Sequence, residues 1–194
     1  MSYHIYTTEA IILKRTSFGE ANILLHVLTE DLGLIQASAR SARLSVSKLR
    51  PALQEYSLVS ISCVKGKGGW KVTNVAGKGS LYYDLPKSSH VVLARAAQVL
   101  MKMITGESPH PEIFRIVKEA FESIKNIPDE DLQDFETLLV FRILFELGYV
   151  AKDAGVAEFL DEPQPWDTVL LQKANSERVH LVSLINKALK ESHL

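Results

Sequence analysis

Cysteine is nearly absent from this chain of 194 residues, which contains only Cys63. An intramolecular disulfide is therefore impossible, and a zinc site built from several cysteines of one chain is excluded. So few thiols fit a reducing compartment. The first residues also lack the basic start and the long apolar core of a signal peptide. We therefore expect a cytoplasmic protein.

Long apolar runs are also missing. No stretch approaches the roughly 18 residues that are needed to span a bilayer. The longest candidate, between Leu138 and Leu147, is interrupted by Arg142 and Glu146. We expect no membrane association.

Motifs for catalysis are absent as well. The chain has no G-x-x-x-x-G-K-[ST] phosphate loop, no H-E-x-x-H and no G-x-S-x-G. Cys63 lies on the apolar side of an expected strand, which suggests an inert buried thiol. We expect no enzyme activity, no metal and no cofactor. The histidines fall on unrelated segments, as surface residues would: His4, His26, His90, His110, His180 and His193.

Charge is distributed unevenly along the chain, although the net charge is only −1. Residues 1–85 contain ten basic and six acidic residues, a net charge of +4, and residues 86–194 contain twelve and seventeen, a net charge of −5. Within residues 36–78 there are eight basic residues and one acid, Glu55. Such a difference between the two halves indicates a polyanionic partner for the first half.

The first half has the period-2 alternation of β-strands, with glycine-containing turns between the strands. Five short strands with a longer third-to-fourth connection are typical of the OB-fold, a Greek-key barrel that commonly binds single strands or oligosaccharides. The expected strands are residues 8–15, 22–29, 34–40, 58–65 and 70–75.

After Leu85-Pro86 the apolar period changes to that of helices. We expect helices from a serine cap at Ser88 or Ser89, after Pro111, from Pro128 to Gly148 and after residues 175–176, with the third central to a bundle because it is apolar nearly all round. The prediction is an α+β protein with an OB-fold DNA-binding domain over residues 1–80 and an α-helical domain over residues 81–194.

The basic residues of the first half are the only group with a clear binding chemistry. Lysine and arginine side chains from separate loops of a barrel can line one groove and neutralise phosphates. Phe18 and Trp70 could stack on bases, but Trp70 could equally fill the barrel. The candidate DNA-binding residues are Lys14, Arg15, Arg40, Arg43, Lys48, Arg50, Lys65, Lys67, Trp70 and Lys71.

Several segments in a specific order resemble the RecO recombination and repair proteins. These are E-A-I-I-L-K at 9–14, F-G-E-A-N at 18–22, L-T-E-D-L-G-L-I at 28–35, A-R-S-A-R at 39–43, S-K-L-R at 47–50 and L-Q-E-Y at 53–56. The resemblance is strong over residues 8–75 and looser after residue 85.

This resemblance implies an N-terminal OB-fold and a helical domain. It implies binding to single- and double-stranded DNA, annealing of complementary strands, and loading of recombinase onto DNA coated with single-strand-binding protein. The implied partners are RecR, a RecA-type recombinase and the acidic C-terminal tail of the single-strand-binding protein. The matching positions Arg40, Arg43, Lys48 and Arg50 are implied DNA contacts.

The chain departs from many relatives at one place. They have a four-cysteine zinc module after the central helix, whereas residues 149–163 contain no cysteine and the chain looks shortened there. We expect the zinc module to be absent. Two other functions stay open: an OB-fold module that binds protein without DNA, and an enzyme whose site is assembled from dispersed residues.

Overall fold

The structure is a computed structural model, and it describes residues 4–43, 47, 49–80, 83–151, 155–160 and 166–192, with only the backbone at 78–80. The chain divides into two compact units. The first comprises Met1–Leu85 with Thr105–Phe114, and the second comprises Pro86–Ile104 with Arg115–Leu194.

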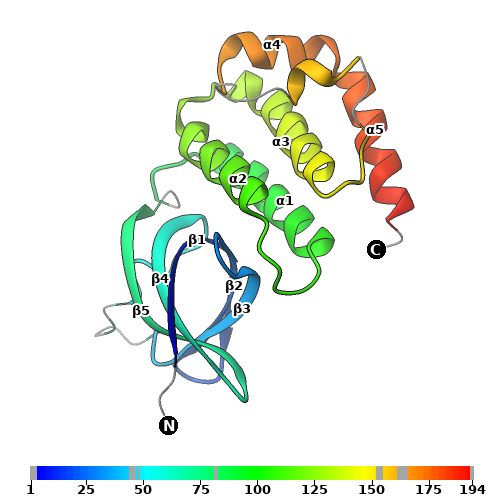
Figure 1. The fold of residues 1–194 in the computed structure, drawn as a ribbon. Coiled ribbons are helices and arrows are strands. Elements are labelled where there is room, and N and C mark those ends of the chain that lie inside the picture. The colour runs from blue at the N-terminus through cyan, green and yellow to red at the C-terminus, as the bar shows by residue number, and fades with distance from the viewer. Residues whose placement is uncertain are drawn as a thin grey trace. The chain divides into compact units, whose positions relative to one another are not determined.

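The first unit is built on a closed five-stranded barrel with the strand order β1-β2-β3-β5-β4 (Figure 1). All neighbours are antiparallel except β3 and β5, whose parallel pairing closes the barrel. The predicted OB-fold-type barrel followed by helices is thereby confirmed. The strands are β1 (Ile5–Phe18), β2 (Asn22–Thr29), β3 (Gly33–Ala39), β4 (Ser57–Gly66) and β5 (Gly69–Ser80).

Alternation of side chains produces the core of the barrel. Ile23, Leu25 and Val27 of β2 are fully buried, and the residues between them point outward. The pairing register of β1 with β2 shifts between Ile12 and Lys14. A bulge of this kind bends a strand, which allows the single long strand β1 to pair with β4 in its first half and with β2 in its second.

The last residues of the connection between β3 and β4 pack against β1. The backbone N–H of Tyr56 donates to the Ile12 carbonyl at 2.7 Å, and the N–H of Arg15 donates to the Glu55 carboxylate at 2.9 Å. Leu53 is fully buried among the barrel residues. The connection is therefore part of the folded barrel unit.

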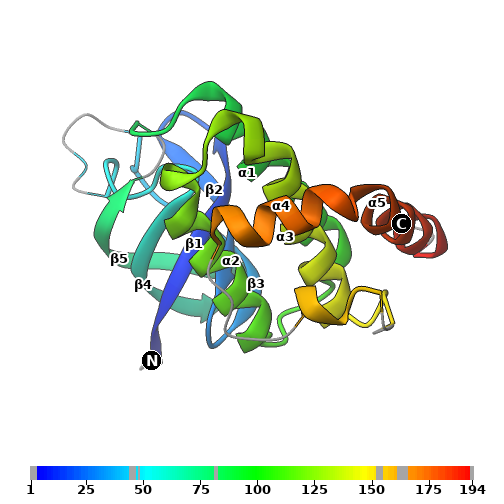
Figure 2. The ribbon, with the colours of Figure 1, turned by 90° about the horizontal axis from the view of Figure 1, so that it is seen from above.

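The second unit is helical, and α3 is its centre. Figures 1 and 2 show α3 lying with α1, α4 and α5, and it contacts all three. Phe135, Leu138 and Phe141 of α3 are fully buried, which confirms the prediction that this segment is the central helix. The α-helices are α1 (Lys87–Met103), α2 (Pro111–Ser123, whose first turn belongs to the barrel unit), α3 (Leu132–Glu146), α4 (Thr168–Ser176) and α5 (Arg178–Glu191). Short 3-10 turns cover Ile124–Asn126, Asp129–Asp131 and Ala157–Phe159.

One expectation for the helices was wrong in detail, and one helix was missed. The first helix begins at Lys87 after Pro86, with no side-chain cap, and the Ser88 hydroxyl is hydrogen-bonded to Asp129 instead. The last helix, α5, follows residues 175–176 as predicted, and these two residues end α4. The helix α4 itself was missed, although Asp167 caps it by accepting a hydrogen bond from the Leu170 N–H at 2.9 Å.

No helix in the part of the chain that the structure describes combines the length and the apolar character needed to cross a membrane.

Gly33 generates the first prediction, because it has φ +73° and a Cβ built on it would lie 2.1 Å from the Ser108 carbonyl oxygen. Gly33→Ala should therefore lower the free energy of unfolding by about 2–5 kcal/mol, from backbone strain and overpacking. Gly69→Ala is the matched control, since Gly69 has φ +89° with no atom within 4 Å of the new Cβ. Gly69→Ala should lower the free energy of unfolding only through backbone strain, by about 1–2 kcal/mol. Urea unfolding measures both, and equal losses would contradict the close packing against Ser108.

Candidate nucleic-acid interface

The outward side chains of the sheet form rows, because paired strands hold equivalent positions side by side. Thr16 of β1 is paired with Leu24 of β2, Leu24 with Ser38 of β3, and Ser38 with Lys71 of β5. These four residues are exposed or half-buried. The row continues across the pairing of β3 with β5, which closes the barrel. Lys71 therefore lies on the same surface as Thr16, Leu24 and Ser38 of the three other strands.

A second row lies two residues along each strand from the first. Lys14 is paired with His26, and His26 with Gln36. Lys14 and Gln36 are exposed, whereas His26 is partly buried and its Nδ1 has no hydrogen-bond partner. Desolvation by burial lowers the pKa of His26 below its usual 6.5, and the charge of Lys14 lowers it further.

A third row begins at Phe18, whose side chain is 43% exposed and which is paired with Asn22. Asn22 accepts a hydrogen bond from the backbone N–H of Ser41 at 3.1 Å, which fixes the chain directly after β3. Arg40, immediately before Ser41, is exposed. We call the three rows together the outer face, which consists of Lys14, Thr16, Phe18, Asn22, Leu24, His26, Gln36, Ser38, Arg40 and Lys71.

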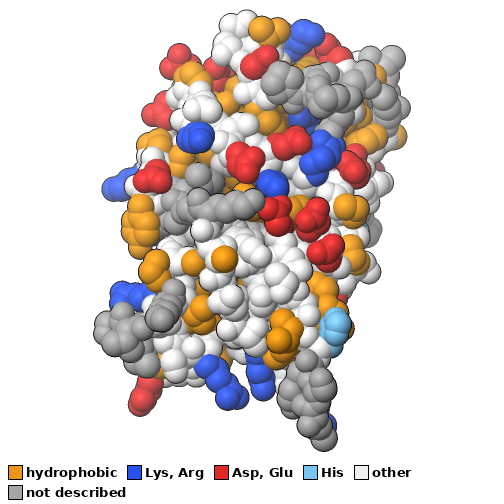
Figure 3. All heavy atoms as spheres, turned by 60° about the vertical axis from the view of Figure 1, so that its left-hand side comes forward, with side chains coloured by type: hydrophobic (Ala, Val, Ile, Leu, Met, Phe, Trp, Pro, Cys, Tyr) orange, Lys and Arg blue, Asp and Glu red, His pale blue; other side chains and the backbone are white. Residues whose placement is uncertain are grey.

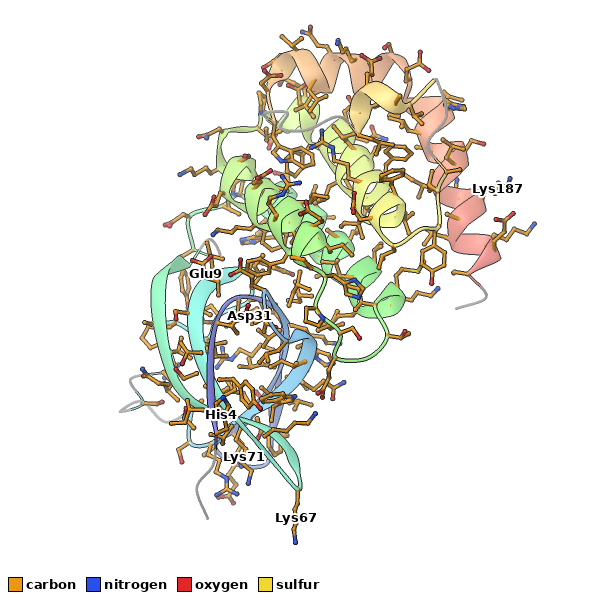
Figure 4. The ribbon with its side chains drawn as sticks, viewed as in Figure 1. His4, Glu9, Asp31, Lys67, Lys71 and Lys187 are labelled. Carbon is orange, nitrogen blue, oxygen red and sulfur yellow. The ribbon has the colours of Figure 1, made fainter. Side chains whose placement is uncertain are left out.

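Lysines and arginines gather at one end of the barrel, where Figure 3 also shows an acidic side chain. Figure 4 shows Lys67 and Lys71 at the same end of the barrel as His4, with Glu9 and Asp31 at the other end. Blue lysine and arginine side chains also project from this lower end of the barrel in Figure 3. One end of the barrel unit is therefore the more attractive to a polyanion.

The structure brings some of the predicted basic residues together on or beside the outer face and leaves their charges available. Lys14, Arg40 and Lys71 are on this face, and Lys67 is exposed in the hairpin that leads into β5. Within the described part of the chain, none of these four has an acidic group within 4 Å.

Two other predicted arginines hold loops in place. Arg15 donates from Nη1 to the Gln54 side chain at 3.1 Å, and Arg43 donates from Nη1 to the Gly19 carbonyl at 3.2 Å. Arg50 is exposed on the connection, where its carbonyl accepts a hydrogen bond from Gln54. Lys48 lies outside the described residues.

Lys65 and Trp70 form a separate cluster. Lys65 Nζ is 2.6 Å from Glu107 Oε2 and 5.3 Å from the centre of the Trp70 ring. Trp70 is 5% exposed and packs in the barrel core, with the Tyr6 ring against it at 5.3 Å. Trp70 therefore fills the barrel, which was one of its two expected roles, and its ring is not open to a base.

The outer face also contains residues that the sequence analysis did not select. His26, Gln36 and Leu24 are absent from the predicted set because they have no net charge. Their positions follow from the alternation of β2 and β3, so a search for residues on the outward side of these strands would have found them.

Among the residues that the structure describes, neither Cys63 nor a cluster of acids and histidines offers a second chemistry. Burial raises the pKa of the Cys63 thiol to about 11, so the reactive thiolate is scarce. Among the described residues, no group of three or more His, Cys, Asp or Glu side chains could hold a metal ion.

The helical unit has a pocket of its own, of about 260 Å³, between α1, α3 and α5. Its rim includes Arg95, which forms an ion pair with Glu136 at 3.1 Å. Apolar side chains dominate the rest of the lining, including Val99, Val140 and Ile185.

Comparison with known proteins supplies a family for the barrel. Residues 1–76 match the family model described as "Recombination protein O N terminal". The chain is 32% identical over 133 residues to a protein named "DNA repair protein RecO" from Dehalococcoides mccartyi strain 195, a match that covers 66% of this chain and 51% of that protein.

Two other proteins named "DNA repair protein RecO" extend the similarity into the helices. The protein from Heliobacterium modesticaldum is 25% identical over 170 residues, covering 84% of this chain and 60% of its own length. The protein from Mannheimia succiniciproducens is 24% identical over 180 residues, covering 90% and 74%. The chain spans about half the length of the D. mccartyi relative.

His26 generates a prediction about the charge of the outer face. Because its folded pKa lies below 6.5, the unfolded chain binds the proton first as the pH falls, so His26 destabilises the fold below about pH 6.5. Lys14→Met should raise the pKa of His26 in a titration followed by NMR, since it removes the neighbouring positive charge. Lys67→Met is the control and should leave this pKa unchanged. A pKa that does not respond to Lys14→Met would place the two side chains apart.

Proposed function

The chain belongs to the RecO family through its N-terminal barrel, and we propose that it is a DNA-binding recombination mediator that acts in DNA repair. In this proposal the barrel, residues 1–80, is the DNA-binding domain, and residues 81–194 form the helical domain. The protein binds and anneals DNA strands and helps to load recombinase onto DNA coated with single-strand-binding protein.

One observation supports DNA binding most strongly, namely the row that joins Thr16, Leu24, Ser38 and Lys71 across four strands. It places a lysine of β5 on the same surface as residues of β1, β2 and β3. Arg40 extends this surface beyond β3. A continuous path of this kind suits a phosphodiester strand, whereas scattered charges do not.

The binding energy would come from phosphates and from stacking. Each neutralised phosphate of a single strand contributes about −0.7 to the slope of log affinity against log salt concentration. Four contacts, from Lys14, Arg40, Lys67 and Lys71, therefore correspond to a slope of about −3. A base stacked on the exposed ring of Phe18 would add about 1–3 kcal/mol. Neither contribution depends on sequence, as annealing requires.

Annealing needs no catalytic group. A positive surface that holds two polyanions lowers their repulsion, and base pairing then supplies the free energy. We therefore propose that the protein is not an enzyme and that it acts in the cytoplasm. Its proposed partners, beyond DNA, are RecR, a RecA-type recombinase and the tail of the single-strand-binding protein.

Neutralising the outer face tests DNA binding. At 0.1 M salt, the loss of one phosphate contact lowers single-strand affinity about fivefold and reduces the salt slope by about 0.7. Arg40→Met and Lys71→Met should each show this change, and the double variant should show about twice the change in slope. Fluorescence anisotropy with a random-sequence oligonucleotide measures both quantities.

Lys187→Met is the matched control, because Lys187 lies on α5 of the helical unit (Figure 4). It should leave affinity and slope unchanged. If the wild-type chain shows no salt-dependent binding near 50 mM salt, the alternative applies, in which the barrel is a protein-interaction module without DNA binding.

We also propose that the pocket between α1, α3 and α5 accepts the acidic tail of the single-strand-binding protein. Arg95 at its rim can exchange the Glu136 carboxylate for one of the peptide. Arg95→Glu should weaken binding of a synthetic tail peptide at least about tenfold, as measured by calorimetry, because a like charge then faces the peptide. Arg115→Glu, on α2 and outside this pocket, is the control; equal losses from both variants would contradict the placement.

A further inference from the structure

Lys65 lies in a cluster with one carboxylate, from Glu107, and one aromatic ring, from Trp70. Lys65 Nζ donates to Glu107 Oε2 at 2.6 Å, and Lys65 also lies over the Trp70 ring, 5.3 Å from its centre. Glu107 is in the segment between α1 and α2 that belongs to the barrel unit. The Glu107 carboxylate thus binds the Lys65 ammonium group, which would otherwise be available to anions from solution.

The Trp70 indole is the second donor. Its side chain is 95% removed from solvent, and Nε1 is buried without a hydrogen bond of standard geometry. The Glu107 carboxylate and the Trp70 ring both lie beside Lys65. The hydrogen bond from Lys65 is the main cause that lowers the pKa of Glu107, partial burial opposes it, and the indole N–H lowers it further. A buried donor without a hydrogen-bond partner can be satisfied by an anion with several oxygens.

The segment that contains Glu107 is held against the barrel independently of this ion pair. The α-carbon of Gly33 packs so closely on the Ser108 carbonyl that a Cβ would lie 2.1 Å from its oxygen. The backbone next to Glu107 is therefore fixed, and only the carboxylate needs to move for Lys65 and Trp70 to become available.

We propose that Lys65 and the Trp70 indole N–H form a phosphate subsite of the DNA-binding barrel, and that Glu107 occupies this subsite when DNA is absent. This inference rests on the proposed DNA binding. A phosphate that enters must displace the carboxylate, so Glu107 lowers the affinity for every polyanion. Lys65 lies at the start of the hairpin that contains Lys67, so a strand that reaches Lys67 from the outer face passes close to it.

Removing the charge of Glu107 tests the subsite. An exposed lysine–carboxylate pair is weak, so Glu107→Gln should raise single-strand affinity by about two- to fivefold. It should also make the salt slope steeper by up to about 0.7, the contribution of one phosphate. Glu191→Gln removes the same charge from α5 of the helical unit and should change neither quantity.

Lys65→Met completes a double-mutant cycle. In the wild-type chain it should weaken binding by less than about twofold, because breaking the pair with Glu107 offsets much of the gain. In the Glu107→Gln chain it should weaken binding by about fivefold at 0.1 M salt, since a full phosphate contact is then lost. Equal effects in the two backgrounds would overturn the subsite.

The indole N–H gives a direct readout, because the chain has only two tryptophans. In indole-labelled protein, the Trp70 signal should move on addition of an oligonucleotide, and should move further in Glu107→Gln. The Trp166 signal, which belongs to the helical unit beside Arg142, should stay in place.

The outcomes separate the two claims. If the wild-type chain binds DNA but Glu107→Gln binds no better and the Trp70 signal does not move, the subsite is wrong and the outer face alone binds. If neither protein binds DNA at any salt concentration, the proposed function and the subsite are overturned together.

Discussion

The parallel pairing of β3 with β5 is the constraint on which the rest of the barrel unit depends. Ala37 is opposite Trp70 and Ser38 is opposite Lys71, and the Ser38 hydroxyl also donates to the Trp70 carbonyl at 3.2 Å. Because strand residues alternate between faces, this register turns Trp70 into the core and Lys71 outward. A slip of one residue would expose the indole and bury the ammonium group. Burial of Trp70 thus fixes where the last lysine of the outer face lies.

The hydrogen bonds and ion pairs of the barrel divide its cations into two groups. Arg15 and Arg43 donate to groups of neighbouring loops, and Lys65 is paired with Glu107. These side chains stabilise the conformation of loops and are only partly available to a ligand. The cations of the outer face have no such partner among the described residues, so they contribute their full charge to a polyanion. A strand would therefore contact the outer face first and reach the Lys65 subsite afterwards.

The sequence predicted the strands and the barrel because alternation and turn residues are local signals. Residues 22–29 were placed correctly for this reason. The place of Lys71 beside Ser38 in the first row could not be predicted, because it depends on β3 pairing with β5 across a long connection. The same limit applies to Lys65, whose partner Glu107 is 42 residues away. The helix α4 was missed because it is short and follows a proline-rich segment, with Asp167 as its only clear start signal.

Backbone amide chemical shifts during titration with a single-stranded oligonucleotide test the central claim most directly. If the outer face binds the strand, the largest changes will occur at Leu24, Ser38 and Lys71, which belong to one row on three strands. The amides of Glu9 and Asp31, at the opposite end of the barrel from Lys71 (Figure 4), will change little. Changes concentrated at Glu9 and Asp31, or confined to the helical unit, would contradict the assignment of this face.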